Sequence, residues 1–164
     1  MIEAFIGVGS NLGDRKANLL DAVERLSSSE VSVGAISSVY ESAAILVTDQ
    51  PDFLNIVVKV TTTISPEALL SRCLAVEEQM GRVRHQRWGS RNIDLDLLLY
   101  DNVTLRADGL DLPHPGVFDR PFVLVPLLEI APDLGFPSGE LVASLVTSKM
   151  QEAVCNVGRL DSNG

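Results

Sequence analysis

The chain has 164 residues, of which 46% are hydrophobic and 5% aromatic, so it is long enough for one domain with a mostly aliphatic core. Its formal net charge of −9 disfavours broad nucleic-acid binding, and no apolar run approaches the ~20 residues that cross a bilayer. No secretory signal is visible, and Cys73 and Cys155 lie far apart, so we expect free thiols in a cytoplasmic protein.

The first third of the chain alternates between strand and helix patterns. Residues 3–9 read as a short strand that ends in glycines, and apolar residues at helical spacing predict a helix over 14–26. Residues 31–40 alternate apolar with small or polar residues, which predicts a half-buried strand. Residues 42–52 lack periodicity and predict a loop, whereas the β-branched residues 53–64 predict another strand.

A second helix begins at Ser65, a good N-cap that is followed by a proline, and ends at Gly81. The remaining expected elements are a loop at 82–91, a strand at 93–100, helices at 122–130 and 140–146, and a frayed tail at 161–164. The order predicts an α+β fold, a ferredoxin-like βαββαβ core sandwich with a C-terminal helical extension. We expect residues 1–164 to form a single domain.

Two aspartates on the strand at 93–100 form the first candidate site. Alternate side chains of a strand share a face, so Asp94 and Asp96 should project together while Leu95 and Leu97 face the other way. A hard cation such as Mg²⁺ relieves the repulsion between two such carboxylates. The alternative is an exposed acidic strand face, but the flanking apolar run indicates a buried strand and favours metal binding.

An arginine-rich segment precedes these aspartates. Residues 82–91 read RVRHQRWGSR and contain four arginines, whose planar guanidinium groups match phosphate oxygens, together with Trp88, which can stack on a flat ring. The alternative is a solvated loop whose arginines pair with surface acids. A cationic segment followed directly by paired carboxylates suggests a confined site for Mg²⁺ and a triphosphate.

Two weaker patterns remain. The glycines between Gly7 and Gly13 do not match G-x-G-x-x-G, because Leu12 stands where that motif requires glycine, and a tight strand-to-helix turn explains them. His114 lies between two prolines, which restrict its backbone, and it is near Arg120 in the sequence. A contact from His114 to a phosphate is therefore credible.

Residues 87–98, RWGSRNIDLDLL, resemble the signature of the 6-hydroxymethyl-7,8-dihydropterin pyrophosphokinase family of folate biosynthesis. Four further blocks resemble the same family in order and spacing: GSNLG at 9–13, DQPDFLN at 49–55, the stretch from Pro113 through Phe122, and 126–132. The resemblance implies transfer of pyrophosphate from ATP to the hydroxymethyl oxygen of the pterin with release of AMP. It further implies two Mg²⁺ ions and ATP as co-substrate. The net charge and the short apolar runs lead us to expect no nucleic-acid or membrane partner, and we also expect a monomer.

The resemblance also implies roles for particular residues. Asp94 and Asp96 would hold the metal ions, and Asp94 would also contact the pterin. The implied catalytic residues are Arg82, Arg91, Asp94, Asp96, His114 and Arg120. The implied nucleotide-binding residues are Leu70, Glu77, Arg84, Arg87, Trp88, Leu97 and His114, and the implied pterin-binding residues are Ala43, Phe53, Asn55, Asp94 and Phe122. Phe53 and Pro115 stand where many members carry tyrosine.

Two other functions stay open from the residues alone. Gly-Ser and Asp-x-Asp also occur in Mg²⁺-dependent nucleotidyltransferases, but here the two elements lie more than eighty residues apart. A ferredoxin-like module that binds a small molecule is the second alternative, although it would not need paired acids beside four arginines.

Overall fold

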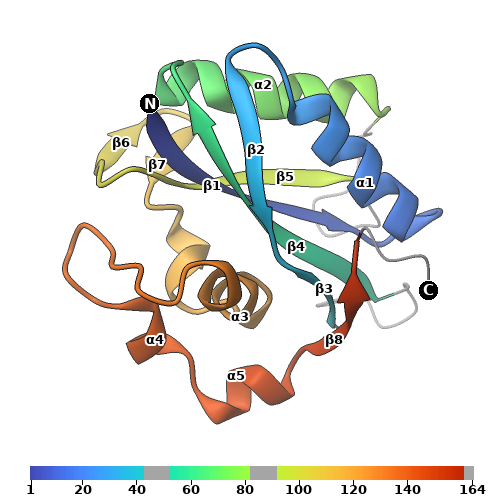
Figure 1. Ribbon diagram of the computed structural model, residues 1–164, viewed down its shortest axis with the longest axis vertical. Helices are drawn as coiled ribbons and strands as arrows, with labels where there is room; N and C mark the ends of the chain where they lie inside the picture. Colours follow the sequence, from blue (N-terminus) through green and yellow to red (C-terminus); the bar gives the residue numbers. More distant parts are fainter. Residues whose placement is uncertain (43–51, 82–91, 161–164) are drawn as a thin grey trace.

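The computed structural model describes residues 1–42, 52–81 and 92–160. Their main feature is a six-stranded antiparallel sheet (Figure 1). The strands lie in the order β5 (Asp94–Tyr100), β1 (Ile2–Ser10), β4 (Phe53–Thr62), β3 (Ser38–Ser42) and β8 (Cys155–Arg159), and β2 (Val31–Ile36) also pairs with β4. The chain is therefore a mixed α/β protein built on an antiparallel sheet.

Two helices, α1 (Arg15–Leu26) and α2 (Pro66–Gln79), cover one face of the sheet. The side chain of Asp14 caps α1 by accepting from the Ala17 N–H at 3.2 Å, and that of Ser65 caps α2 from the Ala68 N–H at 3.1 Å. Their apolar sides pack on alternate residues of the central strands, which form the larger core cluster.

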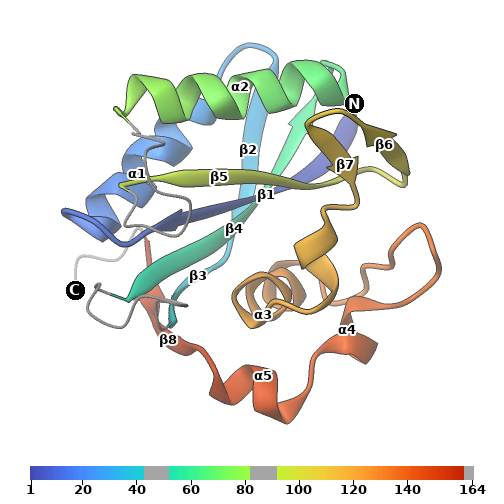
Figure 2. The ribbon, with the colours of Figure 1, turned by 180° about the vertical axis from the view of Figure 1, so that it is seen from behind.

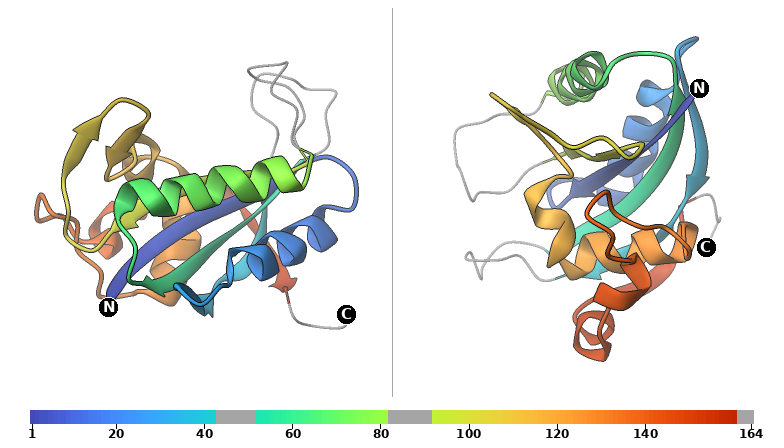
Figure 3. Two further views of the ribbon diagram at one scale, coloured as in Figure 1. Left: turned by 90° about the horizontal axis from the view of Figure 1, so that it is seen from above. Right: turned by 90° about the vertical axis from the view of Figure 1, so that its left-hand side faces the viewer.

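The C-terminal part of the chain covers the opposite face, as Figures 2 and 3 show. Its elements are η1 (Pro115–Phe118), α3 (Pro121–Ile130), α4 (Val142–Leu145) and α5 (Ser148–Glu152). Residues of α3 and α4 pack there against Phe5, Val57, Leu98 and Leu99 in a second core cluster. The sheet is thus the middle layer of three.

A bulge in β5 decides which side chains point to which layer. Ile6 lies opposite Leu97, but Phe5 lies opposite Leu99, so Leu98 is an extra residue in the pairing of β5 with β1. Leu97 and Tyr100 are three residues apart and would face opposite sides of a regular strand. Because Leu98 is an extra residue, both instead pack toward α1 and α2. Leu98 and Leu99 instead both pack in the α3 cluster.

The expected elements of the first hundred residues are confirmed within the described ranges. The predicted strand at 31–40 is interrupted at Ser37, and the expected loops at 42–52 and 82–91 lie mostly or wholly outside the described residues, as does the tail. The predicted helix at 140–146 is shorter than expected. A small hairpin of β6 (Leu105–Ala107) and β7 (Leu110–Leu112), helix α5 and strand β8 were not predicted. No helix in the described part of the chain is long and apolar enough to span a membrane.

Candidate active site

Asp94 and Asp96 share the sheet face that looks toward α3, as the strand alternation predicts. Both are partly exposed, whereas Leu95 and Leu97 between and after them are buried against α1 and α2. The neighbouring strand β1 places Gly9 opposite Asp94 and Gly7 opposite Asp96. The two carboxylates therefore stand beside backbone that carries no side chain on the same face.

The glycines continue this open surface toward β4. Gly9 lies between Asp94 on one side and Asn55 on the other, and a Cβ atom added at Gly9 would lie 2.8 Å from Oδ1 of Asn55. The sequence interpretation of Gly7 and Gly9 as part of a tight turn was wrong, because both lie inside β1. Gly13, with φ of +76°, is in the turn. Alternating glycines within a strand pattern are the signal that could have indicated a place where another group approaches the backbone closely.

His114 is held beside Asp96 by its own backbone and ring. Its N–H donates to the Leu98 carbonyl at 2.9 Å, and its Nδ1 accepts from the Gly116 N–H at 3.0 Å. Since Nδ1 is an acceptor, the neutral ring carries its proton on Nε2, which lies 3.8 Å from Oδ1 of Asp96. The ring thus directs a donor toward the carboxylate pair.

Burial lowers the pKa of His114, and the positive charge of Arg120 lowers it further, against the opposite influence of Asp94 and Asp111. The imidazole is therefore neutral at physiological pH. Its side chain is 26% exposed, which leaves it accessible to a ligand. A neutral N–H donor suits a phosphate contact without adding a charge that must be desolvated.

Arg120 and Phe122 stand at the start of α3. A Cβ atom added at Gly116 would overlap Nε of Arg120, so the arginine side chain packs directly over this glycine. The Arg120 guanidinium carbon lies 5.9 Å from the centre of the Phe122 ring, within range of a cation–π contact. The structure therefore brings Arg120 and Phe122 together on the α3 side of the sheet, with His114 close to them.

Phe53 and Asn55 belong to the same face, at the start of β4. Asn55 is buried and donates from Nδ2 to Oγ of Ser42 at 3.1 Å, and Phe53, two residues before it, is partly buried. Arg15, which sequence reasoning missed, donates to Oε2 of Glu41 at 2.9 Å and to the Asp52 carbonyl at 2.6 Å. It ties α1 to the ends of β3 and β4, and no local pattern shows such a contact.

Three expected nucleotide-binding residues lie behind the sheet. Leu97 is buried in the core under α1 and α2, and Leu70 packs against that core from α2. Glu77 is 2% exposed, and its Oε2 accepts from the N–H of Leu95 at 2.8 Å. The structure thus separates the buried Leu97 and Glu77 from the face that carries the aspartates, whereas Leu70 is partly exposed. The other expected residues lie outside the described residues: Ala43, Arg82, Arg84, Arg87, Trp88 and Arg91.

Among the described residues, no cluster of three or more His, Cys, Asp or Glu side chains is arranged to hold a metal ion. Two carboxylates on one face nevertheless match the way Mg²⁺ is commonly held, by one or two carboxylates together with substrate phosphates. Asp94 and Asp96 therefore offer oxygen donors of the kind that a hard cation takes.

Comparison with known proteins finds a family that matches most of the chain. Residues 5–132 match the family described as 7,8-dihydro-6-hydroxymethylpterin-pyrophosphokinase. A protein of Methylorubrum extorquens named 2-amino-4-hydroxy-6-hydroxymethyldihydropteridine pyrophosphokinase is 47% identical over 135 residues, which are 82% of this chain and 85% of that protein. A protein of the same name from Haemophilus influenzae is 42% identical over 147 residues, 89% of this chain and 92% of its own length.

Solved structures share the fold at low sequence identity. A Plasmodium falciparum HPPK-DHPS crystal structure with pteroate superposes with a TM-score of 0.72 at 14% identity and covers 92% of this chain. This chain spans 43% of that longer protein, so the likeness shows the fold of the matched part alone. By the family match and the identities to its relatives, the chain belongs to the 7,8-dihydro-6-hydroxymethylpterin-pyrophosphokinase family.

Proposed function

We propose that this chain transfers pyrophosphate from ATP to the hydroxymethyl oxygen of 6-hydroxymethyl-7,8-dihydropterin in folate biosynthesis. The bond from that oxygen to the β-phosphorus forms, the bond from the β-phosphorus to the α–β bridging oxygen breaks, and AMP leaves while the hydroxyl proton is lost. The observation that carries the proposal is the carboxylate pair of Asp94 and Asp96 on a glycine-backed face between His114 and Asn55.

The proposal includes two Mg²⁺ ions held by Asp94 and Asp96. When bound, Mg²⁺ neutralises phosphate charge and fixes the phosphoryl group relative to its acceptor. The oxygen donors of the two aspartates suit this cation, and their placement on one strand face lets both reach the same ligand.

Positive charge and hydrogen-bond donors complete the phosphate side. The Nε2 atom of His114 lies 3.8 Å from Oδ1 of Asp96, and the positive charge of Arg120 is close enough to His114 to lower its pKa. Both side chains can supply donors to phosphate oxygens. We assign Arg82 and Arg91 to stabilisation of the transferred group. Since phosphoryl-type transfer depends mainly on positioning and charge neutralisation, no nucleophilic side chain is required.

The pterin would lie over the same sheet face. We propose that Phe53 and Phe122 stack on its two sides and that Asn55 hydrogen-bonds to its edge, with Ala43 and Asp94 adding contacts. The supporting observation is that Phe53 and Phe122 are both partly buried and come from opposite walls of the site, β4 and α3. Flat rings between aromatic side chains provide apolar area, and buried amides read donor and acceptor patterns.

For the nucleotide, we propose contacts from Arg84, Arg87, Trp88 and His114, and from Leu70 on α2. Leu97 and Glu77 are buried, so we place them behind β5, where they support the strand that faces the nucleotide. The strand order β5-β1-β4 followed by β2 and β3, with α1 and α2 on one face, supports a ferredoxin-like core. We further propose a single domain over 1–164, a monomer, and a reducing cytoplasmic compartment, which suits the free thiols.

The experiment is an incubation of the protein with ATP, Mg²⁺ and 6-hydroxymethyl-7,8-dihydropterin, with AMP, ADP and inorganic pyrophosphate separated by chromatography. We expect pterin-dependent AMP without free pyrophosphate. Free pyrophosphate would indicate nucleotidyl transfer, and ADP or an absence of pterin-dependent turnover would refute the proposal. Asp96→Asn should lower turnover by more than a hundredfold, whereas Asp108→Asn, on the exposed β6–β7 turn, should leave it within twofold.

A further inference from the structure

The join between β2 and β3 is a bulge that leaves one backbone donor without a partner in the sheet. Ile36 lies opposite Val58, but Tyr40 lies opposite Asn55, so the register shifts by one residue between them. The Ser37 N–H donates to the Val57 carbonyl at 3.0 Å, and Oγ of Ser37 accepts from the Val57 N–H at 2.9 Å. The next donor, the N–H of Ser38, needs an acceptor from outside the sheet.

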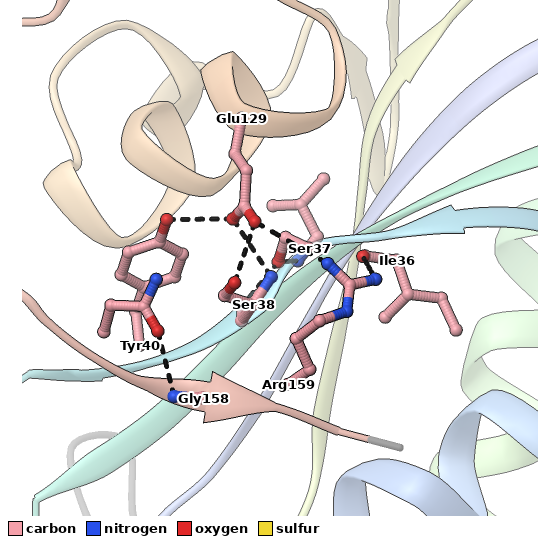
Figure 4. Close-up of polar contacts among 9 residues, drawn as sticks. Ile36, Ser37, Ser38, Tyr40, Glu129, Gly158 and Arg159 are labelled. Carbon is pink, nitrogen blue, oxygen red and sulfur yellow. Dashed lines mark hydrogen bonds and ion pairs between the residues drawn. The ribbon is translucent and has the colours of Figure 1, made fainter. Parts of the chain in front are cut away.

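Glu129, on α3, supplies that acceptor (Figure 4). Its Oε1 accepts from the Ser38 N–H at 3.0 Å and from the Tyr40 hydroxyl at 2.8 Å, and its Oε2 accepts from the Ser38 hydroxyl at 2.8 Å. The guanidinium of Arg159 on β8 lies 3.9 Å from Oε2 and also donates to the Ile36 carbonyl at 3.1 Å. One carboxylate thus fastens α3 to β3 and, more weakly, to β8.

The Tyr40 hydroxyl stays protonated in this cluster and can therefore donate its hydrogen bond. Burial, and after it the hydrogen bond to Glu129, raises the pKa of Tyr40 to about 12, so the phenol keeps its proton at neutral pH. Hydrogen bonds from neutral donors to an ionised acceptor are stronger than those between neutral groups, although the partial exposure of the Glu129 side chain reduces this gain.

The cluster lies on the helix and on the strands that carry the two walls of the candidate pterin site. Phe122 and Glu129 are seven residues apart on α3, close to two helical turns, so they lie on the same side of the helix. Tyr40 lies directly opposite Asn55 of β4, and Phe53 is two residues from Asn55 on the same face. A contact between Glu129 and Tyr40 therefore fixes how far the Phe122 wall stands from the Phe53 wall.

We propose that Glu129 is a positioning residue that sets the width of the slot between α3 and β4, and so governs affinity for the flat pterin ring. The proposal rests on the function proposed above, which places the ring between Phe53 and Phe122. Pro126, between Phe122 and Glu129, cannot donate to the Phe122 carbonyl, so the first turns of α3 have one helical hydrogen bond fewer to hold them. An anchor at Glu129 then matters more for the placement of Phe122.

The test compares Glu129→Gln and Tyr40→Phe with the wild type and with Glu152→Gln, an exposed glutamate on α5, as the control. KM for the pterin, KM for ATP, kcat and the melting temperature are measured for each protein. Glu129→Gln keeps one acceptor oxygen and loses the charge, and Tyr40→Phe removes one donor and keeps the ring. We expect KM for the pterin to rise five- to twentyfold for Glu129→Gln and two- to tenfold for Tyr40→Phe, with KM for ATP and kcat within twofold.

A purely structural role would produce a different pattern. If the melting temperature falls while KM for the pterin stays unchanged, or if both KM values rise equally, Glu129 does not position the pterin slot and the proposal is wrong. Should Glu129→Gln fail to fold, Tyr40→Phe gives the same comparison with a smaller change. An active wild type with unaffected variants refutes this inference alone, whereas a wild type without pterin-dependent AMP refutes the proposed function and this inference with it.

Discussion

Gly9→Ala is a sharp perturbation of the site, because it adds one methyl group at a place where the distances are known. The new Cβ would lie 2.8 Å from Oδ1 of Asn55, a contact that real Cβ atoms do not make, while the Asn55 Cγ and the Leu54 carbonyl would both lie at 3.8 Å. Gly9 does not have a positive φ, so alanine fits the backbone and only the contact with Asn55 must be relieved.

The relief comes from rotation of the Asn55 amide, which breaks its 3.1 Å hydrogen bond to Ser42. Asn55 is 7% exposed, so a lost partner is not replaced by water, and the free energy of unfolding should fall by about 1–3 kcal/mol. If Asn55 reads the pterin edge, KM for the pterin should rise about tenfold, the equivalent of about 1.4 kcal/mol of binding energy.

Urea unfolding and steady-state kinetics with each substrate varied in turn measure both effects. The control is Gly34→Ala on β2, another strand glycine, whose added Cβ would meet the Lys59 carbonyl at 3.4 Å, an ordinary contact. This control should change neither KM and should leave the unfolding free energy within about 1 kcal/mol. A Gly9→Ala protein with wild-type unfolding free energy would refute the crowding argument, and one with lowered stability but wild-type KM for the pterin would refute the assignment of Asn55 to the pterin edge.

Three further outcomes are expected. In urea unfolding, the free energy of unfolding of Glu77→Leu should be about 1–3 kcal/mol lower than that of Glu77→Gln, because leucine leaves the Leu95 N–H without this acceptor. Equal free energies of unfolding would contradict the structural role of Glu77. Folding lowers the pKa of His114, so the unfolded chain binds the proton more readily than the folded protein. With divalent cations chelated, the free energy of unfolding should therefore fall as pH drops below about 6.5 toward the folded pKa. The His114→Gln variant should lose this pH dependence. Burial raises the pKa of Cys73 to about 12, so iodoacetamide applied to the folded protein should label the exposed Cys155 alone, as peptide mass spectrometry can check.

Local chemistry explains what the sequence predicts well. The caps at Asp14 and Ser65 and the turn at Gly81 act within a few residues, so both major helices could be placed from their flanks. The same holds for Asp94 and Asp96, whose shared face follows from the period of a strand. The short hairpin also had a local signal, since Asp108-Gly109 is a typical turn pair, and Gly109 has the positive φ such turns need.

Features that depend on distant partners could not be predicted in this way. The bulge at Leu98 reverses the strand alternation, and nothing in a run of leucines shows where an extra residue falls. β8 carries mostly exposed residues and exists because it pairs with β3, whose register is set elsewhere. The partners of Glu129 lie 89 and 91 residues away in the sequence, so no periodicity connects them.

The contacts along β5 have a consequence for the behaviour of the protein in a crowded solution. Among the described strands, β5 is the last at its side of the sheet, and such a strand offers backbone groups with which another chain can pair. Here the Leu95 N–H is taken by Glu77 and the Leu98 carbonyl by the N–H of His114. Glu77 and the backbone of His114 therefore also occupy backbone groups with which a second chain could otherwise pair. A variant that breaks these hydrogen bonds should aggregate more readily.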